Sequence, residues 1–453
     1  MVSSVKKRSG RTVKFNADKI KTAITKANRD VKQSDPTAKV LTKEQIDRVT
    51  EDVVFLLVPR GENIDIEQIQ DTVEHALMSR GYYDVAKSYI LYREKHRIQR
   101  DASLHLMEQC REYLFSEAKD NDNKRENANI NGDASMGIML KLGTEVAKTY
   151  AKYFSMPDEF TKMHVENYVH IHDLDFSQIC WNCCQIDLLK LIKGGFNTGH
   201  GGIREGNSVR AYSALACVAL QSNQNEMYGG QSINCWDWAM AEGIRKSFQH
   251  AIRDEIKRYM IFHKIPGDAK EIVKHIDYSL CHYSHESDKS FKKDQKSGAR
   301  QIVSTLRCLE EDALKIFILA CQDVEEETHQ AMEAAIHNFN SLHSRAGGQV
   351  PFSSINFGMD TSCEGRLATR ETLNAIEAGM GYGETAIFPI AVFQVKSGIN
   401  YRTEDPNYDL FKRSMEVSAK RLFPNWVSLD SSFNSPYYKE GDYNSFVATM
   451  GLL

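Results

Sequence analysis

Apolar residues at helical spacing dominate the first hundred positions of the chain. Ile66, Ile69, Val73 and Leu77 lie on one face of a segment that ends before Gly81. Before the first helix, the residues "SVKKRSGRTVKFN" form two short alternating runs around a Ser-Gly turn, which predicts a β-hairpin. The same periodicity predicts three further short helices, in the segments 17–28, 42–58 and 83–100.

Beyond about residue 132, helical segments alternate with short apolar runs. The runs "ICWNCCQIDLL", "VPFSSINFGM" and "IFPIAVFQV" are typical of buried strands. This alternation predicts an α/β fold with a sheet covered by helices. We therefore expect a small separate domain over residues 1–97, a linking helix and connection over 98–130, and a larger α/β domain over 131–453.

Composition and charge narrow the possible functions. The formal net charge of −4 gives no general attraction to nucleic acid or to anionic membranes. The N-terminus has no apolar stretch of the secretory kind, and the apolar runs are too short to span a bilayer. The ten cysteines are scattered, which favours reduced thiols over a disulfide framework. We expect a cytoplasmic protein that binds neither nucleic acid nor membrane and holds no metal.

Cations gather at the predicted hairpin. Lys6, Lys7, Arg8 and Arg11 surround its turn, and Lys19 follows one turn into the next helix. Together with the amides of the turn and of the helix N-terminus, these side chains are suited to holding a polyphosphate. A solvated basic hairpin with no ligand is the alternative that charge alone favours.

Adjacent cysteines stand in the first strand-like run of the second domain. Successive residues of a strand point to opposite faces, so only one of Cys183 and Cys184 faces a given cavity. One interpretation is a redox role for that thiol, and the other is that both pack in the interior, as free cysteines commonly do. The strand register decides which thiol points where.

Two parts of the chain resemble known families. Residues 3–96, from "VKKRSGRTVKFNADKI" to "VAKSYILYREK", resemble the ATP-cone, a nucleotide-binding regulatory module of ribonucleotide reductases. Residues 124–430 resemble the anaerobic (class III) ribonucleoside-triphosphate reductases, which are glycyl radical enzymes. The motifs that carry this second resemblance include "KRENANINGD", "HIHDLDFSQICWNCCQIDL", "GFNTGHGGIREGNSV", "GGQVPFSSINFGMDTS" and "GETAIFPIAVFQVKSGINY".

The resemblance implies a set of site residues and a fold. In the ATP-cone, Lys7, Arg8, Asn16 and Lys19 would face ATP or dATP bound as an allosteric effector, with Arg11 as a further candidate. The rest of the chain would form an incomplete ten-stranded α/β barrel of the glycyl radical enzyme type. In the barrel, Cys183 is the preferred second reducing cysteine, and Cys184 is the alternative.

The family's reaction and partners follow from the same resemblance. A glycyl radical oxidises a finger-loop cysteine, and the resulting thiyl radical takes the 3′ hydrogen of the ribose so that the 2′ hydroxyl can leave. Formate or a dithiol is the final reductant. Ribonucleoside triphosphates and dNTP effectors, a radical-SAM activating enzyme and a second copy of the chain in a homodimer are the implied partners.

The last residues of the sequence bear on activity. In the family the finger-loop cysteine follows a Met-Gly pair, whereas here Met450-Gly451 is followed by Leu452 and Leu453. The resemblance therefore predicts a chain that stops before this cysteine and before the zinc-binding and glycyl radical segments. Such a chain would bind nucleotide and be inactive alone. The alternatives are a catalytically dead regulatory subunit or decoy, and an unrelated helical nucleotide-binding protein.

Overall fold

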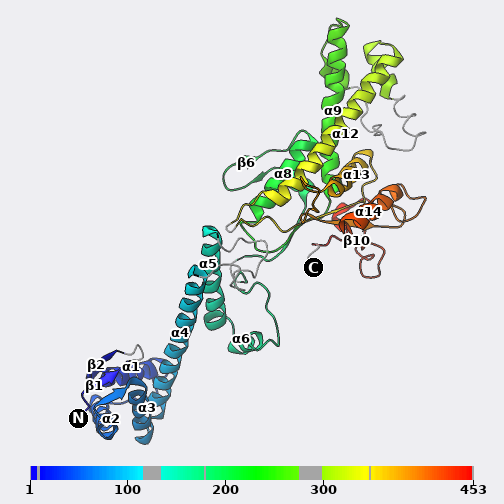
Figure 1. Ribbon diagram of the computed structural model, residues 1–453. Coiled ribbons are helices and arrows are strands. Elements are labelled where there is room, and N and C mark those ends of the chain that lie inside the picture. The colour runs from blue at the N-terminus through cyan, green and yellow to red at the C-terminus, as the bar shows by residue number, and fades with distance from the viewer. Residues whose placement is uncertain are drawn as a thin grey trace. The chain divides into compact units, whose positions relative to one another are not determined.

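The computed structural model describes residues 2–7, 11–115, 134–177, 180–274, 298–345 and 348–450, without the side chains of 98–105. The chain forms two compact units (Figure 1). The first unit comprises Met1–Glu112 and Lys148–His170, and the second comprises Tyr113–Ala147 and Ile171–Leu453. The domain limits expected at residues 97 and 130 stay a prediction. Among the described helices, none is long and apolar enough to cross a membrane.

The first unit opens with a small sheet. Strands β1 (Ser4–Lys6) and β2 (Thr12–Lys14) pair antiparallel, with Val5 opposite Val13, so the predicted hairpin is confirmed. Strand β3 (Asn63–Asp65) adds to the other edge of β1 in parallel and gives the order β2-β1-β3. This third strand was not predicted, because three residues are too few to show alternation.

Four helices surround this sheet, as the periodicity predicted. They are α1 (Asp18–Ser34), α2 (Lys43–Leu57), α3 (Ile66–Ser79) and α4 (Tyr83–Phe115). A reciprocal capping box fixes the start of α2, where Thr42 Oγ1 accepts from Gln45 N at 3.3 Å and Gln45 Oε1 accepts from Thr42 N at 2.8 Å. Helix α4 has 33 residues, so the expectation of a short fourth helix was wrong.

The core of the first unit forms where the helices meet the sheet. Its buried members come from β1, β3 and all four helices, as the amphipathic spacing requires. They include Val5, Ile24, Val49, Val53, Leu57, Ile64, Val73, Leu77 and Val85.

Helix α5 (Ser135–Tyr150) ends in a π-helical turn, η3 (Ala151–Ser155), and α6 (Asp158–Val165) follows.

A five-stranded parallel sheet organises the second unit. Its strands are β4 (Cys184–Ile186), β7 (Gln231–Ile233), β8 (Ser353–Phe357), β9 (Ile390–Val395) and β10 (Asn425–Ser428). They lie in the order β10-β9-β8-β7-β4, and every neighbouring pair is parallel. Strands β4, β8 and β9 confirm the three predicted apolar runs, and the α/β class is confirmed. The described strands form an open sheet rather than a closed barrel.

The connections between strands are helical. Helices α7 (Leu188–Gly194) and α8 (Val209–Asn223) flank a small hairpin of β5 (Phe196–Asn197) and β6 (Gly202–Ile203) between β4 and β7. Helices α9 (Trp236–Phe262), α10 (Ala269–Val273) and α12 (Glu310–Ser341) precede β8. Helix α13 (Cys363–Ala378) leads to β9, and α14 (Tyr408–Arg421) leads to β10. A 3-10 turn, η5 (Tyr443–Ser445), comes last.

The two faces of the sheet differ in chemistry. Ile233, Ile355, Phe357 and Phe393 belong to the main hydrophobic core, together with side chains of α8, α9, α12 and α13. Successive side chains of a strand point to opposite faces of the sheet, so the residues next to these four in the sequence point away from the core. There the strands carry polar residues, namely Gln185, Ser232, Ser354, Asn356 and Gln394. The apolar face is thus covered by helices, and the polar face is left for a different contact.

Candidate functional site

A hollow on the first unit lies between α1 and α4. Its volume is about 130 Å³, and it is lined by Lys19, Thr22, Ala23, Lys26, Ala27, Tyr89 and Tyr92. Two ammonium groups and two phenol rings therefore surround one small space. Cations with adjacent aromatic rings are suited to a ligand that carries both phosphate and an aromatic base.

The predicted effector residues are only partly brought together here. Lys19 lines the hollow, whereas Lys7, Arg11 and Asn16 are exposed and do not line it. Lys7 N donates to Arg11 O at 2.8 Å and closes the hairpin turn. Asn16 Oδ1 accepts from Asp18 N at 2.8 Å, so this side chain holds the start of α1. Arg8 lies outside the described residues.

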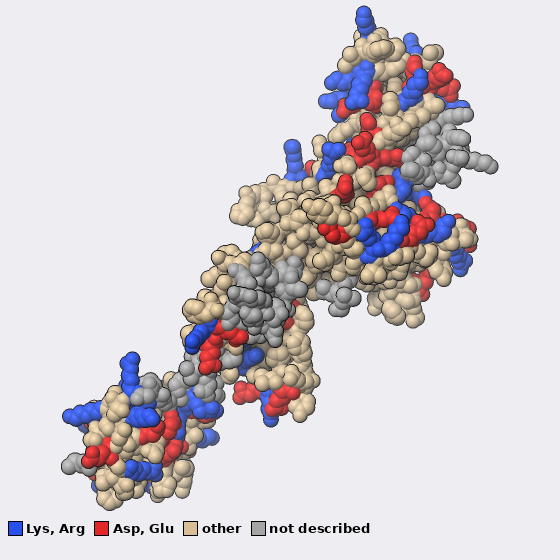
Figure 2. Space-filling model, in the orientation of Figure 1, with Lys and Arg blue, Asp and Glu red and all other residues tan. Residues whose placement is uncertain are grey.

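The two tyrosines that line the hollow were not predicted from the sequence. Tyr89 and Tyr92 lie three residues apart on α4, in a stretch that predicted only a helix. Tyr89 is 7% exposed and belongs to the core, whereas Tyr92 is 48% exposed and packs edge-on to His96. The visible face of this unit mixes both signs of charge (Figure 2). Any anion binding must therefore depend on local placement rather than on a broad positive field.

The adjacent cysteines lie at the edge of the large sheet and have different surroundings. Cys184 begins β4 and points toward α8, where its Sγ is 3.3 Å from Met227 Sδ and accepts from Asn223 Nδ2 at 3.2 Å. Burial raises the pKa of the Cys184 thiol, and the hydrogen bond from Asn223 opposes that rise. Cys184 is therefore a packed, protonated thiol on the helix-covered side.

Cys183 packs closely against the backbone of Gly229. A Cβ added to Gly229 would come within 2.8 Å of Cys183 Sγ, so only glycine leaves room for this thiol. Cys183 precedes β4 and lies outside its pairing with β7, so its closest printed contact is the one with Gly229. The two thiols therefore differ in their surroundings, which the sequence could not distinguish.

The polar face of the sheet is occupied by residues 447–450. The backbone of this segment bonds to side chains from four strands. Ser232, Ser354, Asn356 and Gln394 are at most 1% exposed, so the segment closes over groups that would otherwise need water. No motif in the sequence indicated a site at these residues, although "SSINF" and "QSI" place polar side chains within short buried strands.

Two buried carboxyl groups hold the loop after β8. Asp237 Oδ2 accepts from the backbone N–H groups of Gly358, Met359 and Asp360, each at 2.9 Å. Burial raises the pKa of Asp237, and these hydrogen bonds oppose the rise. Burial, with a further contribution from Asp237, raises the pKa of Asp360 to about 7. The pair anchors the first turn of α9 to the end of the central strand.

Comparison with known families agrees with this geometry. The family model of the anaerobic ribonucleoside-triphosphate reductase matches residues 126–451, which include the whole sheet and both cysteines.

The chain belongs to the anaerobic ribonucleoside-triphosphate reductase family.

Its first unit carries a second match, because the model of the ATP cone domain covers residues 3–98.

Individual relatives support both assignments. The anaerobic ribonucleoside-triphosphate reductase of Salmonella typhimurium is 28% identical over 447 residues, which are 96% of this chain and 54% of that protein. The ribonucleoside-diphosphate reductase subunit alpha of Chlamydia pneumoniae is 44% identical over 98 residues, 20% of this chain and 9% of that protein. The chain thus spans about half the length of the anaerobic reductases that it matches.

A solved structure is also similar. The crystal structure of the anaerobic ribonucleotide reductase from Thermotoga maritima in complex with dATP and CTP has 11% sequence identity and a TM-score of 0.43. The similarity covers 75% of this chain and 50% of that one.

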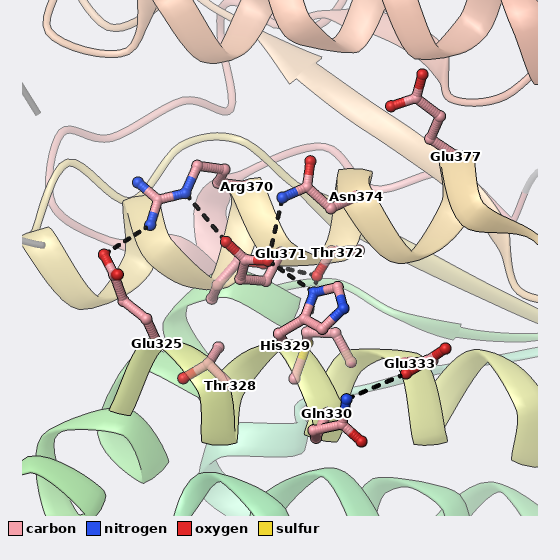
Figure 3. Close-up of polar contacts among 12 residues, drawn as sticks. Glu325, Thr328, His329, Gln330, Glu333, Arg370, Glu371, Thr372, Asn374 and Glu377 are labelled. Atoms are coloured by element: carbon pink, nitrogen blue, oxygen red, sulfur yellow. Dashed lines mark hydrogen bonds and ion pairs between the residues drawn. The ribbon is translucent and has the colours of Figure 1, made fainter. Parts of the chain in front are cut away.

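A cluster of polar side chains in the second unit lies between helices α12 and α13. Glu371 on α13 bonds through its carboxylate to His329 of α12 at 3.0 Å, to Arg370 at 3.1 Å and to Asn374 at 3.1 Å (Figure 3). Arg370 also reaches Glu325 of α12 at 3.3 Å. Because the groups satisfy one another, we interpret the cluster as a fastening between α12 and α13. Within the described ranges, no group of three or more His, Cys, Asp or Glu side chains is placed to hold a metal ion.

Proposed function

We propose that the chain supplies the effector-binding module and the cysteine-bearing part of the sheet in an enzyme that reduces ribonucleoside triphosphates to 2′-deoxyribonucleoside triphosphates. The observation that carries the proposal is the placement around Cys183. This thiol packs against Gly229 directly before the edge strand, in a region matched by the reductase family, while Cys184 is packed against α8.

The proposed role of Cys183 is that of a reducing thiol. After the 3′ hydrogen of the ribose has been taken by a thiyl radical and the 2′ hydroxyl has left as water, Cys183 donates hydrogen to the sugar. Formate or a dithiol supplies the two electrons of the overall reduction. A glycyl radical supplies the one-electron oxidation that begins the sequence. The shielded polar face supports this chemistry, because a radical must be kept from water and oxygen.

The first unit is proposed to bind ATP or dATP as an allosteric effector. The hollow with Lys19, Lys26, Tyr89 and Tyr92 supports this role, and the resemblance to ATP-cones adds Lys7, Arg8, Arg11 and Asn16 as effector contacts. Lysines would neutralise phosphate charge, and the tyrosine rings would contact the base. The proposed partners are substrate triphosphates, dNTP effectors, a radical-SAM activating enzyme and a second copy of the chain. The cytoplasm is the proposed location.

An anaerobic reconstitution tests this function. The chain is combined with a polypeptide that supplies the part of the family's length that it does not span, together with the activating enzyme, and deoxyribonucleotide formation is measured. We expect activity that Cys183→Ala abolishes and Cys184→Ala retains. Activity retained in Cys183→Ala would overturn the assignment of the thiol. ATP binding without any activity would instead indicate a regulatory subunit.

A further inference from the structure

Side chains from four strands converge on one short piece of backbone. Gln394 Nε2 donates to Val447 O at 3.0 Å, and Gln185 Nε2 donates to Ala448 O at 2.9 Å. Each contact is made to the main chain of the segment, so the sheet recognises the path of the segment rather than its side chains. The remaining donors, to Thr449 O and Met450 O, are Ser232, Asn356 and Ser354.

Asn356 makes the most specific of these contacts. Its Oδ1 accepts from Thr449 N at 3.0 Å, and its Nδ2 donates to Thr449 O at 3.1 Å. One amide therefore satisfies both polar groups of the same residue, as a neighbouring strand would. A shift of the segment by one residue would break both bonds at once, because donor and acceptor positions would no longer match.

The amide of Asn356 is itself held in place. Its Nδ2 also lies 2.9 Å from Ser232 Oγ and 3.2 Å from Ile233 O, both on the adjacent strand β7. Ser232 Oγ in turn donates to Thr449 O at 3.0 Å. Both side chains are fully buried, so an altered arrangement would leave polar groups without partners. This preorganisation makes Asn356 a fixed reference point on the sheet.

We propose that Asn356, supported by Ser232, is a positioning residue for the reductase reaction: it fixes the register of Thr449 on the sheet. Residues 447–450 are consequently held at a set place on the polar face of the sheet. This inference rests on the proposed function for its catalytic meaning, while the positioning itself can be measured without any nucleotide.

Amide hydrogen exchange of the chain alone tests the positioning. Asn356→Leu removes both bonds to Thr449, so the exchange rate of the Thr449 amide should rise about tenfold or more, the effect of losing one to two net hydrogen bonds. Ile355→Val is the matched control, because the neighbouring side chain points into the core and makes no bond to the segment. Equal exchange at Thr449 in Asn356→Leu and in the control would overturn the proposal.

Ser232→Ala provides a second variant in case Asn356→Leu does not fold. It deletes one donor to Thr449 O and one partner of Asn356 with little change in volume. We expect a smaller rise in Thr449 exchange, about threefold, which follows from losing a single shared bond. An unchanged rate in a folded Ser232→Ala protein would count against the proposal.

The reconstituted enzyme tests the consequence for catalysis. A positioning role predicts that Ser232→Ala and Asn356→Asp lower kcat while KM for the ribonucleotide stays unchanged, because the segment rather than the substrate is displaced. Asn356→Asp keeps the acceptor for Thr449 N–H and should retain more activity than Asn356→Leu. A rise in KM at constant kcat would overturn the positioning role in favour of substrate binding. A failure of the proposed function would remove activity in every variant and leave the exchange result intact.

Discussion

Gly229 packs directly against the thiol of Cys183, so closely that a methyl group on the glycine would lie 2.8 Å from the sulfur. The same methyl group would also collide with the backbone carbonyl of Asn182. Because a backbone atom is involved, a rotamer change cannot relieve the contact. The start of β4 and the position of the candidate thiol therefore depend on the absence of a side chain at residue 229.

Gly229→Ala should displace Cys183 and loosen the edge strand. We expect the free energy of unfolding to fall by about 2–3 kcal/mol, the range for overpacking a close contact. The alkylation rate of Cys183, followed by mass spectrometry of the labelled peptide, should also change. Gly381→Ala is the control, since a Cβ there meets nothing within 4 Å. Identical stability and labelling in the two variants would contradict the proposed contact.

The raised pKa of Asp360 predicts a pH-dependent stability. Its folded-state pKa of about 7 exceeds the ordinary Asp value of 3.8, so the folded protein retains a proton that the unfolded chain releases. The free energy of unfolding should therefore fall as pH rises from about 4 to about 7, by at most about 4 kcal/mol from this group. Urea unfolding across this range measures the slope.

Asp360→Asn should flatten that slope. The amide oxygen can still accept from Ser362 N, as Asp360 Oδ1 does at 2.9 Å, and the group no longer loses a proton. At pH 8 the variant should be more stable than the parent protein. Asp254→Asn, at an exposed position on α9, is the control and should keep the parent's slope. A parental slope in Asp360→Asn would show that another group causes the pH dependence.

Nucleotide affinity should depend on the hollow between α1 and α4. Lys26→Ala and Tyr92→Ala each remove one lining side chain, and we expect ATP affinity to fall about three- to tenfold, equivalent to ~1 kcal/mol. Isothermal titration measures the change. Lys32→Ala removes a cation from the last turn of the same helix, away from the lining residues, and should bind ATP like the parent protein. Equal losses in all three variants would indicate a general charge effect.

The fastening between α12 and α13 should be important for stability. Glu371→Gln replaces the carboxylate that contacts His329, Arg370 and Asn374 with a neutral amide, and leaves Arg370 with one anionic partner fewer. We expect a loss of about 2–3 kcal/mol in chemical denaturation. Glu333→Gln, at a half-buried position on α12 whose carboxylate accepts one long bond from Gln330 Nε2 at 3.4 Å, should change stability by less than about 0.5 kcal/mol. Similar losses in both would contradict the fastening role.

The sequence predicted those elements whose pattern is local. The amphipathic helices of the first unit and the apolar runs at β4, β8 and β9 were recognisable because each carries its own periodicity. Strands β7 and β10 were not predicted, because three or four residues such as "QSI" and "NWVS" are too few to show an alternation of apolar and polar side chains. The length of α4 was also missed, because charged residues along it obscure the apolar stripe.

The candidate site depends on pairings that the sequence does not encode locally. The sequence left the sides of Cys183 and Cys184 open, and the side that Cys184 faces follows from its pairing with Gln231. Lys19 was recognised from the cluster of cations and from the resemblance to ATP-cones, whereas Tyr89 and Tyr92 line one hollow only when α4 packs beside α1. The contact of Asn356 with Thr449 joins residues 93 positions apart, and no local pattern indicates it.

The strand order also implies an order of assembly. Going from β4 through β7, β8 and β9 to β10, each strand pairs with the strand of this sheet that precedes it in the sequence. The sheet can therefore lengthen at one edge during synthesis, without waiting for a distant partner to complete it. Residues 447–450 emerge after all five strands and bond back to β4, β7, β8 and β9. Residues 447–450 thus connect the first strand of this sheet to strands that are made later.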